Sequence, residues 1–196
     1  GEELALFEVA DIPWDRLEAP TPFRREHGRT AKGRDGGRVP LPWSAADEPT
    51  PAPWDAKFGT GASFGFSPAT RPDGTPAADP HLPQPLWYKD FAADVEDSDP
   101  DSMLNLYRRA IAFRQRMLTP TGDTSIRWIG ESEFGDKAGQ VVAYSRVSAD
   151  EGGDRFASIT NFGPDPVELP AGEIIFSSEP ISGFILPADT TVWMMI

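Results

Sequence analysis

The chain contains no cysteine and only two histidines among its 196 residues. The missing cysteines exclude disulfide bonds and thiolate zinc sites. His27 and His81 lie far apart and lack the HxH or HxxxH spacing of paired metal ligands. We therefore expect no metal site, no cofactor and no catalytic histidine.

Long apolar runs and an excess of basic residues are also missing. No run of about 18 apolar residues occurs, so the sequence predicts no membrane-spanning helix. No basic and apolar leader opens the sequence, and we expect a cytoplasmic protein. Acidic residues number 31 against 18 basic ones, a formal net charge of −13. This charge repels nucleic-acid phosphates, whereas neutral hydroxylated ligands such as sugars remain open.

Proline is abundant in one region of the chain. Of the 21 prolines, twelve lie between Pro40 and Pro100. Because proline fixes φ and lacks a backbone donor, residues 40–100 cannot form long helices or interior strands. The same region contains eight Trp, Tyr and Phe side chains, which disordered linkers lack. The composition therefore predicts a packed, irregular loop.

Residues 99–118 predict an amphipathic helix. Asp99 is the expected N-cap, and Pro100 suits the first helical position. Apolar side chains recur on one face at helical spacing. They are Met103, Tyr107, Ala110, Ile111, Met117 and Leu118. Four arginines in the later turns suit the negative end of the helix dipole, and we interpret them as a solvated face.

From Thr124 onward the hydrophobic period changes to two. Six short runs are rich in β-branched and aromatic residues, and turn signals separate them. The runs are SIRWI, QVVAYSRV, RFASITNF, PVEL, EIIFSS and TTVWMMI. They predict an antiparallel β-sandwich of about 75 residues, with SADEGGD as one hairpin connection.

Residues 28–43, GRTAKGRDGGRVPLPW, contain the most informative local motif. Within it, Arg34 and Arg38 flank Asp35 in a glycine-rich turn. Glycine tolerates positive φ, so such a turn can direct charged side chains toward one point. The guanidinium fork suits a carboxylate or adjacent sugar hydroxyls. From the residues alone, a structural ion pair of Asp35 with either arginine is an equally good interpretation.

Several motifs follow one another in a characteristic order. They are GEEL, GRDGGRVPLPW, HLPQPLWYKDF, DPDSMLNLYRRAIAFRQ and LPADTTVWM. This order resembles the C-terminal end of the oligo-1,6-glucosidase and α-glucosidase branch of the α-amylase superfamily, over essentially the whole chain. One departure is Gly37, where the family usually has cysteine. Glycine there is expected to make the turn less tightly packed and the orientation of the Arg38 side chain less fixed.

The resemblance implies a mixed fold, in which the end of a (β/α)8 barrel precedes an all-β antiparallel sandwich. Residues 1–4 would end the eighth strand, residues 5–98 would be the loop after it, and residues 99–118 the eighth helix. The implied domains are 1–120 and 121–196. The chain would be a C-terminal fragment, with the missing N-terminal barrel portion of the same protein as its partner.

The resemblance also implies a retaining, exo-acting α-glucosidase that hydrolyses terminal α-linked glucose from short oligosaccharides. Such enzymes use two carboxylates roughly 5 Å apart. In this family the catalytic carboxylates follow strands four, five and seven, upstream of residue 1. Glu2, Glu3 and Asp35 are therefore given no catalytic role.

What the resemblance assigns to this chain is substrate binding. The family's arginine-aspartate pair places Arg34 on a hydroxyl of the terminal glucose. Arg38 is the second candidate, and a structural partnership with Asp35 suits it better. Trp14 and Trp43 have the flat rings that stack on sugar faces, but core packing is the favoured interpretation for both.

Two alternatives remain open. Glucosyl transfer or isomerisation, as in sucrose isomerases and trehalose synthases, uses the same scaffold. The LPW ending of the motif slightly favours an α-glucosidase. The second alternative is a non-catalytic carbohydrate-binding or structural module, against which the aromatics of the sandwich alternate as core residues do.

We predict that the 196-residue chain, purified alone, does not hydrolyse p-nitrophenyl-α-glucoside or maltose above background. The reason is that the nucleophile and the acid/base are expected to lie outside it. Release of p-nitrophenol is the measurement. Steady turnover that survives repeated purification would contradict the expectation.

Overall fold

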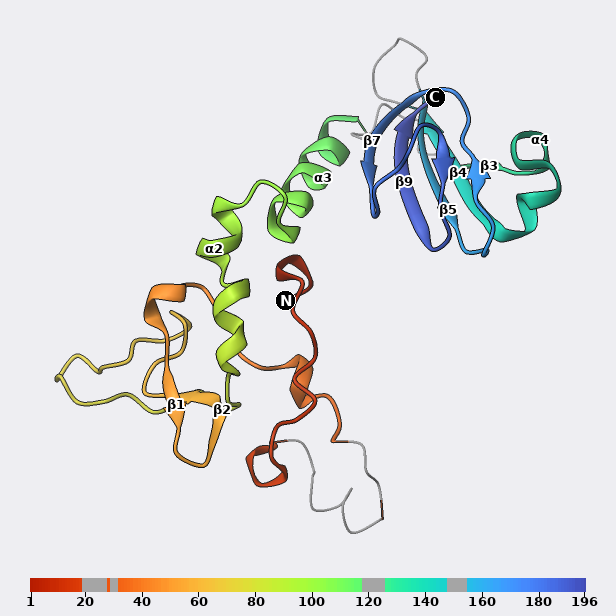
Figure 1. Ribbon diagram of the computed structural model, residues 1–196. Coiled ribbons are helices and arrows are strands. Elements are labelled where there is room, and N and C mark those ends of the chain that lie inside the picture. Colours follow the sequence, from red (N-terminus) through yellow and green to blue (C-terminus); the bar gives the residue numbers. More distant parts are fainter. Residues whose placement is uncertain (19–27, 29–31, 118–125, 148–154) are drawn as a thin grey trace. The chain divides into compact units, whose positions relative to one another are not determined.

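The computed structural model describes residues 1–18, 28, 32–117, 126–147 and 155–196. The chain forms two compact units, Gly1–Arg108 and Arg109–Ile196 (Figure 1). The division falls inside the long helix. The domain boundary that the sequence places at residue 120 stays a prediction.

The first unit consists of short elements joined by irregular chain. Its 3-10 helices are η1 (Glu2–Leu4), η2 (Trp14–Arg16), η3 (Asp35–Gly37), η4 (Ala45–Asp47) and η5 (Leu86–Phe91). Strands β1 (Thr50–Ala52) and β2 (Asp55–Thr60) form a hairpin, and α2 (Ala93–Ser98) follows η5. The strand end expected at residues 1–4 is not present, and η1 occupies that place. A strand needs a paired neighbour for its backbone groups, and the described residues supply none there.

Aromatic side chains from the proline-rich loop form much of the core of this unit. Phe58, Phe64 and Tyr88 are buried together with apolar residues from the preceding segment, which confirms the prediction of a packed loop. Burial raises the pKa of Tyr88 to about 12. At the edge of the core, the ring of Trp54 stacks on Phe58 with centroids 5.4 Å apart. The loop thus folds around its own side chains.

Helix α3 (Met103–Met117) begins later than the sequence predicts. Its N-cap is Ser102, whose Oγ accepts a hydrogen bond from the backbone N–H of Asn105 at 3.2 Å. The expected cap, Asp99, instead accepts from Asp101 N–H at 2.9 Å and closes a turn. The Glu96 carboxylate, on α2, accepts from Leu104 N–H at 2.9 Å. Ser102 and Glu96 satisfy donors of the first helical turn, which fixes where the helix starts.

The apolar face of α3 also differs from the prediction. Ile111, expected on that face, is 52% exposed. The buried residue is Phe113, whose ring packs against Phe156, Phe176 and Trp193 with centroid distances of 5.8, 5.9 and 6.2 Å. One aromatic side chain therefore anchors the second half of the helix.

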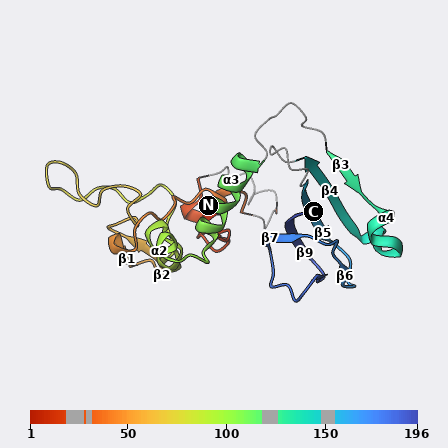
Figure 2. The ribbon, with the colours of Figure 1, turned by 90° about the horizontal axis from the view of Figure 1, so that it is seen from above.

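The second unit is built on antiparallel sheets. Five strands lie in the order β3 (Arg127–Ile129), β4 (Val141–Val147), β5 (Arg155–Asn161), β9 (Thr190–Met195) and β7 (Glu173–Ser177). Strands β6 (Val167–Glu168) and β8 (Ile185–Leu186) form a separate two-stranded sheet. Helices α4 (Glu131–Phe134) and η6 (Gly135–Gln140) lie on the β3 side of the large sheet, away from β7 (Figures 1 and 2).

All six predicted strands are present, which confirms the antiparallel β character of this part of the chain. Strand β8 and the α4–η6 segment are additions that the sequence did not predict. The expected SADEGGD connection lies outside the described residues, although the two strands that it joins pair along their length. The register of β7 against β9 shifts between Ile174 and Phe176, which places a bulge in that outer strand.

Alternation along the strands separates two packing surfaces. Ile159 pairs with Val192 and Ala143, and this face packs on Val167 and Leu186 of the small sheet. The opposite face carries the aromatic rings that receive Phe113. Each fully buried aliphatic side chain contributes about 1.5–3 kcal/mol. Because side chains alternate along each strand, the sheet buries aliphatic residues on one face and aromatic residues on the other.

A set of hydrogen bonds clamps the segment after the glycine-rich turn to the start of α2. The backbone N–H groups of Ala93 and Asp94 donate to the carbonyls of Pro42 and Trp43, at 3.1 and 3.2 Å. In return, the Asp94 carboxylate accepts from Ala45 N–H at 3.0 Å. Partial desolvation raises the pKa of Asp94, but the hydrogen bonds outweigh it and leave the pKa below its usual 3.8.

We predict that Asp94→Ala speeds amide exchange at Ala45 by several-fold at pH 7. An exposed hydrogen bond of this kind contributes about 0.5–1 kcal/mol. Because the pKa of Asp94 is lowered on folding, its contribution is complete above the usual value and is lost as pH falls through the lowered one. The difference between variant and wild type should therefore shrink as the pH falls below the usual aspartate pKa of 3.8.

The matched control is Asp90→Ala, which removes an exposed aspartate of η5 that accepts no hydrogen bond within the described part of the chain. It should leave exchange at Ala45 unchanged. Equal effects of the two substitutions would show that Asp94 does not hold this segment.

Candidate functional site

The glycine-rich turn is closed by backbone hydrogen bonds. Gly37 N–H donates to the Arg34 carbonyl at 3.1 Å, and Arg38 N–H donates to the Asp35 carbonyl at 2.9 Å. Gly33, with φ +93°, reverses the chain immediately before the turn. These hydrogen bonds form η3, with Arg34 and Arg38 as the residues that flank it.

Close approach of a second segment requires glycine at position 36. A Cβ at Gly36 would lie 2.6 Å from the carbonyl oxygen of Val9, whose N–H donates to the Gly36 carbonyl at 3.1 Å. At Gly37 a Cβ would meet nothing within 4 Å in the described part of the chain. Position 37 therefore has room for a small side chain among these residues.

Asp35 is the buried centre of the turn, with 1% of its surface exposed. Its Oδ2 accepts a hydrogen bond from Glu18 N–H at 2.9 Å, and its Oδ1 lies 3.5 Å from Nη1 of Arg38. Arg38 is thus an ion-pair partner of Asp35, as the structural interpretation of that arginine predicts. Its role as the second candidate for sugar binding stays a prediction.

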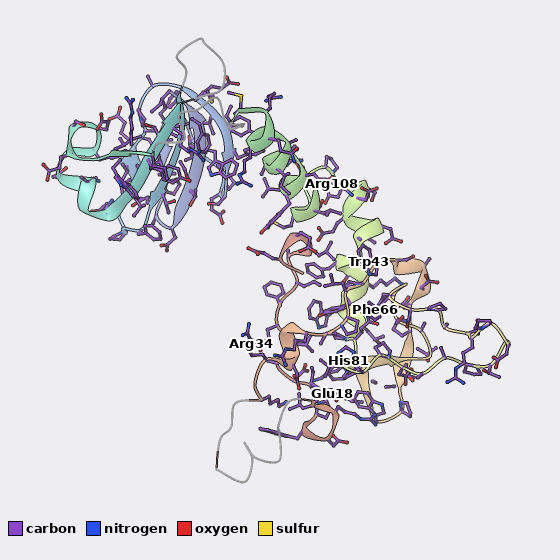
Figure 3. The ribbon with its side chains drawn as sticks, turned by 180° about the vertical axis from the view of Figure 1, so that it is seen from behind. Glu18, Arg34, Trp43, Phe66, His81 and Arg108 are labelled. Carbon is purple, nitrogen blue, oxygen red and sulfur yellow. The ribbon has the colours of Figure 1, made fainter. Side chains whose placement is uncertain are left out.

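Arg34 differs from Arg38 in its contacts. Both side chains are exposed, but that of Arg34 forms no ion pair or hydrogen bond with any residue that the structure describes. Figure 3 shows Arg34 at the glycine-rich turn, apart from Trp43 and Phe66. The turn therefore holds one arginine against the buried carboxylate and leaves the other available to a ligand.

The remaining candidates have local explanations or none. Glu2 accepts a hydrogen bond from Tyr107, which raises the pKa of that phenol. His81 is exposed, and His27 lies outside the described residues. Among the residues described, no three His, Cys, Asp or Glu side chains gather as metal ligands, and no helix is long and apolar enough to cross a membrane.

The two tryptophans considered for sugar stacking behave differently. Trp14 is partly buried. Trp43 is 56% exposed, so the prediction that it packs in the core is wrong. The reason is that the carbonyls of Pro42 and of Trp43 itself accept hydrogen bonds from α2, which fixes the backbone here, while other residues of the unit fill the core.

A cavity that the sequence analysis missed lies in the same unit. It has a volume of about 260 Å³, and its lining includes Asp47 and Phe66. A possible signal was the FGFSP sequence at residues 64–68, where two phenylalanines flank one glycine. Alternating glycine and aromatic residues do not reveal on their own which ring is exposed.

Sequence relatives identify the family. A probable α-glucosidase from Rhizobium meliloti (strain 1021) is 30% identical over 151 residues, which is 77% of this chain and 21% of that protein. The salivary α-glucosidase of Aedes aegypti is 26% identical over 170 residues, 86% of this chain and 24% of that protein. The chain belongs to the α-amylase superfamily. No protein-family model matches it.

Solved structures of α-amylase superfamily enzymes share the fold of the chain. The α-glucosyl transfer enzyme XgtA matches with a TM-score of 0.60 and 26% identity, over 100% of this chain and 31% of XgtA. The trehalulose synthase MutB matches with a TM-score of 0.63 and 21% identity, over 34% of its length. The chain thus spans about a fifth to a third of the α-amylase superfamily proteins that it matches.

We predict that Gly36→Ala destabilises the first unit by about 1–3 kcal/mol, because the new methyl group collides with backbone atoms of Val9. Gly37→Ala should change stability by no more than about 0.5 kcal/mol, since its position is open. Urea unfolding followed by tryptophan fluorescence compares the two. Similar midpoints for both variants would refute the close approach at Gly36.

Proposed function

We propose that the chain forms the C-terminal part of a retaining, exo-acting α-glucosidase, in which Arg34 binds the terminal glucose of short oligosaccharides. The observation that carries the proposal is the contrast between the two arginines of the turn. Arg38 is paired with the buried Asp35, whereas Arg34 is exposed without a partner among the described residues. A guanidinium on a closed turn offers several donors in one plane to adjacent hydroxyls.

The order of the elements supports the placement in a (β/α)8 enzyme. A long loop precedes helix α3, and antiparallel sheets follow it. We propose that the loop follows the eighth strand of the barrel, α3 is the eighth helix and residues 121–196 are the domain after it. Loops at the C-terminal ends of barrel strands form the active site. In this proposal, the catalytic carboxylates come from the N-terminal barrel portion of the same protein.

The chemistry of the chain itself is then positioning. Arg34 would donate hydrogen bonds to hydroxyls of the glucose, while a nucleophile and an acid/base elsewhere in the protein break the glycosidic bond through a glycosyl-enzyme intermediate. A charge-assisted hydrogen bond of this kind contributes roughly 1.5–3 kcal/mol. If the bond shortens as charge develops on the ring, part of that energy lowers the barrier. Exo specificity would follow because the arginine closes the pocket behind one sugar ring.

Glucosyl transfer is the second candidate function, because XgtA, a matched structure, is an α-glucosyl transfer enzyme. Hydrolysis of p-nitrophenyl-α-glucoside releases glucose and p-nitrophenol in equal amounts, whereas transfer to a second sugar releases less glucose. The ratio of the two products in the complete protein distinguishes these activities.

In the complete protein, we predict that Arg34→Ala lowers kcat/KM for p-nitrophenyl-α-glucoside about 10- to 100-fold and leaves the melting temperature unchanged. Arg34→Lys should recover only part of the activity, because an ammonium group lacks the planar fork. Steady-state kinetics and a thermal melt on the same samples test both expectations.

Asp35→Ala is the matched control, since it removes the buried partner of Arg38 and leaves Arg34 in place. It should lower the melting temperature, because a buried hydrogen-bonded carboxylate is lost. If Arg34→Ala and Asp35→Ala behave alike, with a lower melting temperature and unchanged kcat/KM per folded molecule, Arg34 is a structural residue.

A further inference from the structure

The cavity beside residues 62–69 has the composition of a ligand site. Its volume of about 260 Å³ approaches the roughly 300–1,000 Å³ of small-molecule pockets. Its lining combines the aromatic ring of Phe66 with the carboxylate of Asp47 and the serines at 63 and 67. It lies within the first unit, and Figure 3 shows Phe66 apart from Arg34. The cavity is therefore distinct from the glycine-rich turn.

The backbone beneath the cavity adopts an unusual conformation. Phe64 has φ +47° and Gly65 has φ +75°. A bulky residue with positive φ costs about 1–3 kcal/mol and persists only where its surroundings fix it. Here the Phe64 side chain is wholly buried in the core. Such strain is typical of segments that position a functional group.

Hydrogen bonds hold this backbone on both sides. The Phe64 carbonyl accepts from the N–H groups of Trp43 and Ser44, at 2.7 and 2.9 Å, and Phe64 N–H donates to the Asp47 carbonyl at 3.0 Å. The segment from Trp43 to Ser44 is itself clamped to α2. The consequence is a fixed reversal that buries the ring of Phe64 and leaves Phe66 48% exposed.

The polar groups of the cavity can accept further hydrogen bonds. The Asp47 carboxylate is exposed and accepts no hydrogen bond from a side chain or backbone group in the described part of the chain. It lies close to the strained turn, since a Cβ at Gly65 would be 3.3 Å from Asp47 Oδ2. Ser63 Oγ donates its proton to the Ser67 carbonyl at 2.9 Å, so Ser67 Oγ is the donor in the 3.2 Å contact between the two hydroxyls and can still accept from a ligand.

These groups restrict the chemistry of the ligand. A carboxylate accepts hydrogen bonds but donates none, so the ligand must bring donors and cannot be an anion. Calcium and magnesium require several oxygen ligands, and a single carboxylate is too few. The exposed ring of Phe66 offers a flat surface on which an apolar face of the ligand can pack. A pyranose ring combines an apolar face with a rim of hydroxyl donors, and the volume suits one ring.

We propose that this cavity binds one glucosyl ring of an oligosaccharide, with Phe66 against the face of the ring and Asp47 accepting hydrogen bonds from its hydroxyls. That the ring is glucose and not another sugar rests on the function proposed above. The site would add a second point of attachment for the oligosaccharide, separate from Arg34.

Titration of the 196-residue chain with maltotriose, followed by saturation-transfer NMR of the sugar, tests the proposal. We expect saturable binding in the millimolar range, weakened about tenfold or more by Phe66→Ala and by Asp47→Asn. Glucuronate should bind more weakly than glucose, because its negative charge and that of Asp47 repel each other. Absence of saturable binding to the wild-type chain would overturn the proposal, as would unchanged binding to Phe66→Ala.

Two controls keep the result specific. Phe184→Ala removes a phenylalanine of similar exposure, 45%, from the second unit and should leave maltotriose binding unchanged. Phe66→Leu keeps much of the side-chain volume, so an unchanged thermal melt with weakened binding separates ring stacking from a folding defect. Binding by Phe66→Leu as tight as wild type would contradict a role for the ring.

The binding assay needs no turnover, so its outcome is independent of catalysis. If the complete protein hydrolyses α-glucosides through Arg34 and Phe66→Ala still binds maltotriose normally, only the second site is refuted. If the chain binds maltotriose through Phe66 and the complete protein has no glucosidase activity, only the proposed function is refuted.

Discussion

The buried carboxylate of Asp35 determines the arrangement of the glycine-rich turn. A carboxylate removed from water is tolerated only where donors and a cation surround it. Glu18 N–H and the Arg38 guanidinium fill these roles, and the neighbouring Gly36 lies directly against Val9. These contacts bring together three stretches of chain that are otherwise irregular. In this arrangement Arg38 forms the ion pair with the carboxylate, and Arg34 forms none with any described residue.

The two units are stabilised in different ways. In the second unit, alternation along five strands gives each face of the sheet its own set of side chains, aliphatic on one and aromatic on the other. In the first unit, hydrogen bonds between distant backbone groups replace regular ladders, and buried aromatics fill the space between them. An irregular fold of this kind can carry strained positions such as Phe64 because neighbouring segments fix them from several directions.

The sequence predicted those elements whose pattern repeats. Six strands could be predicted because alternation encodes strand and buried face together. Strands β6 and β8 are equally short, but β6 lies within the alternating run PVEL, whereas no such run marks β8. The helix could be predicted from its spacing. Its start could not, because both Asp99 and Ser102 suit an N-cap, and Glu96, on the preceding helix, contributes to the choice.

The candidate site was predictable to a similar extent. Charge and spacing predicted an ion pair of Asp35 with one of the two arginines, and the family resemblance favoured Arg38, which is the partner in the structure. The exposure of Trp43 and Phe66 did not, because the same residue types in the same loop are buried at positions 58, 64 and 88. Which ring faces solvent depends on the positive φ of Phe64 and on long-range hydrogen bonds, and neither leaves a periodic signal in the sequence.

The bulge in β7 affects how the second unit behaves at high protein concentration. Strand β7 is one edge of the large sheet, and an unprotected edge offers a row of donors and acceptors to the strand of another molecule. The shift between Ile174 and Phe176 twists this edge, while the opposite edge, β3, has only three residues. Neither edge presents a long flat ladder, so the fold resists edge-to-edge aggregation and strand exchange between copies.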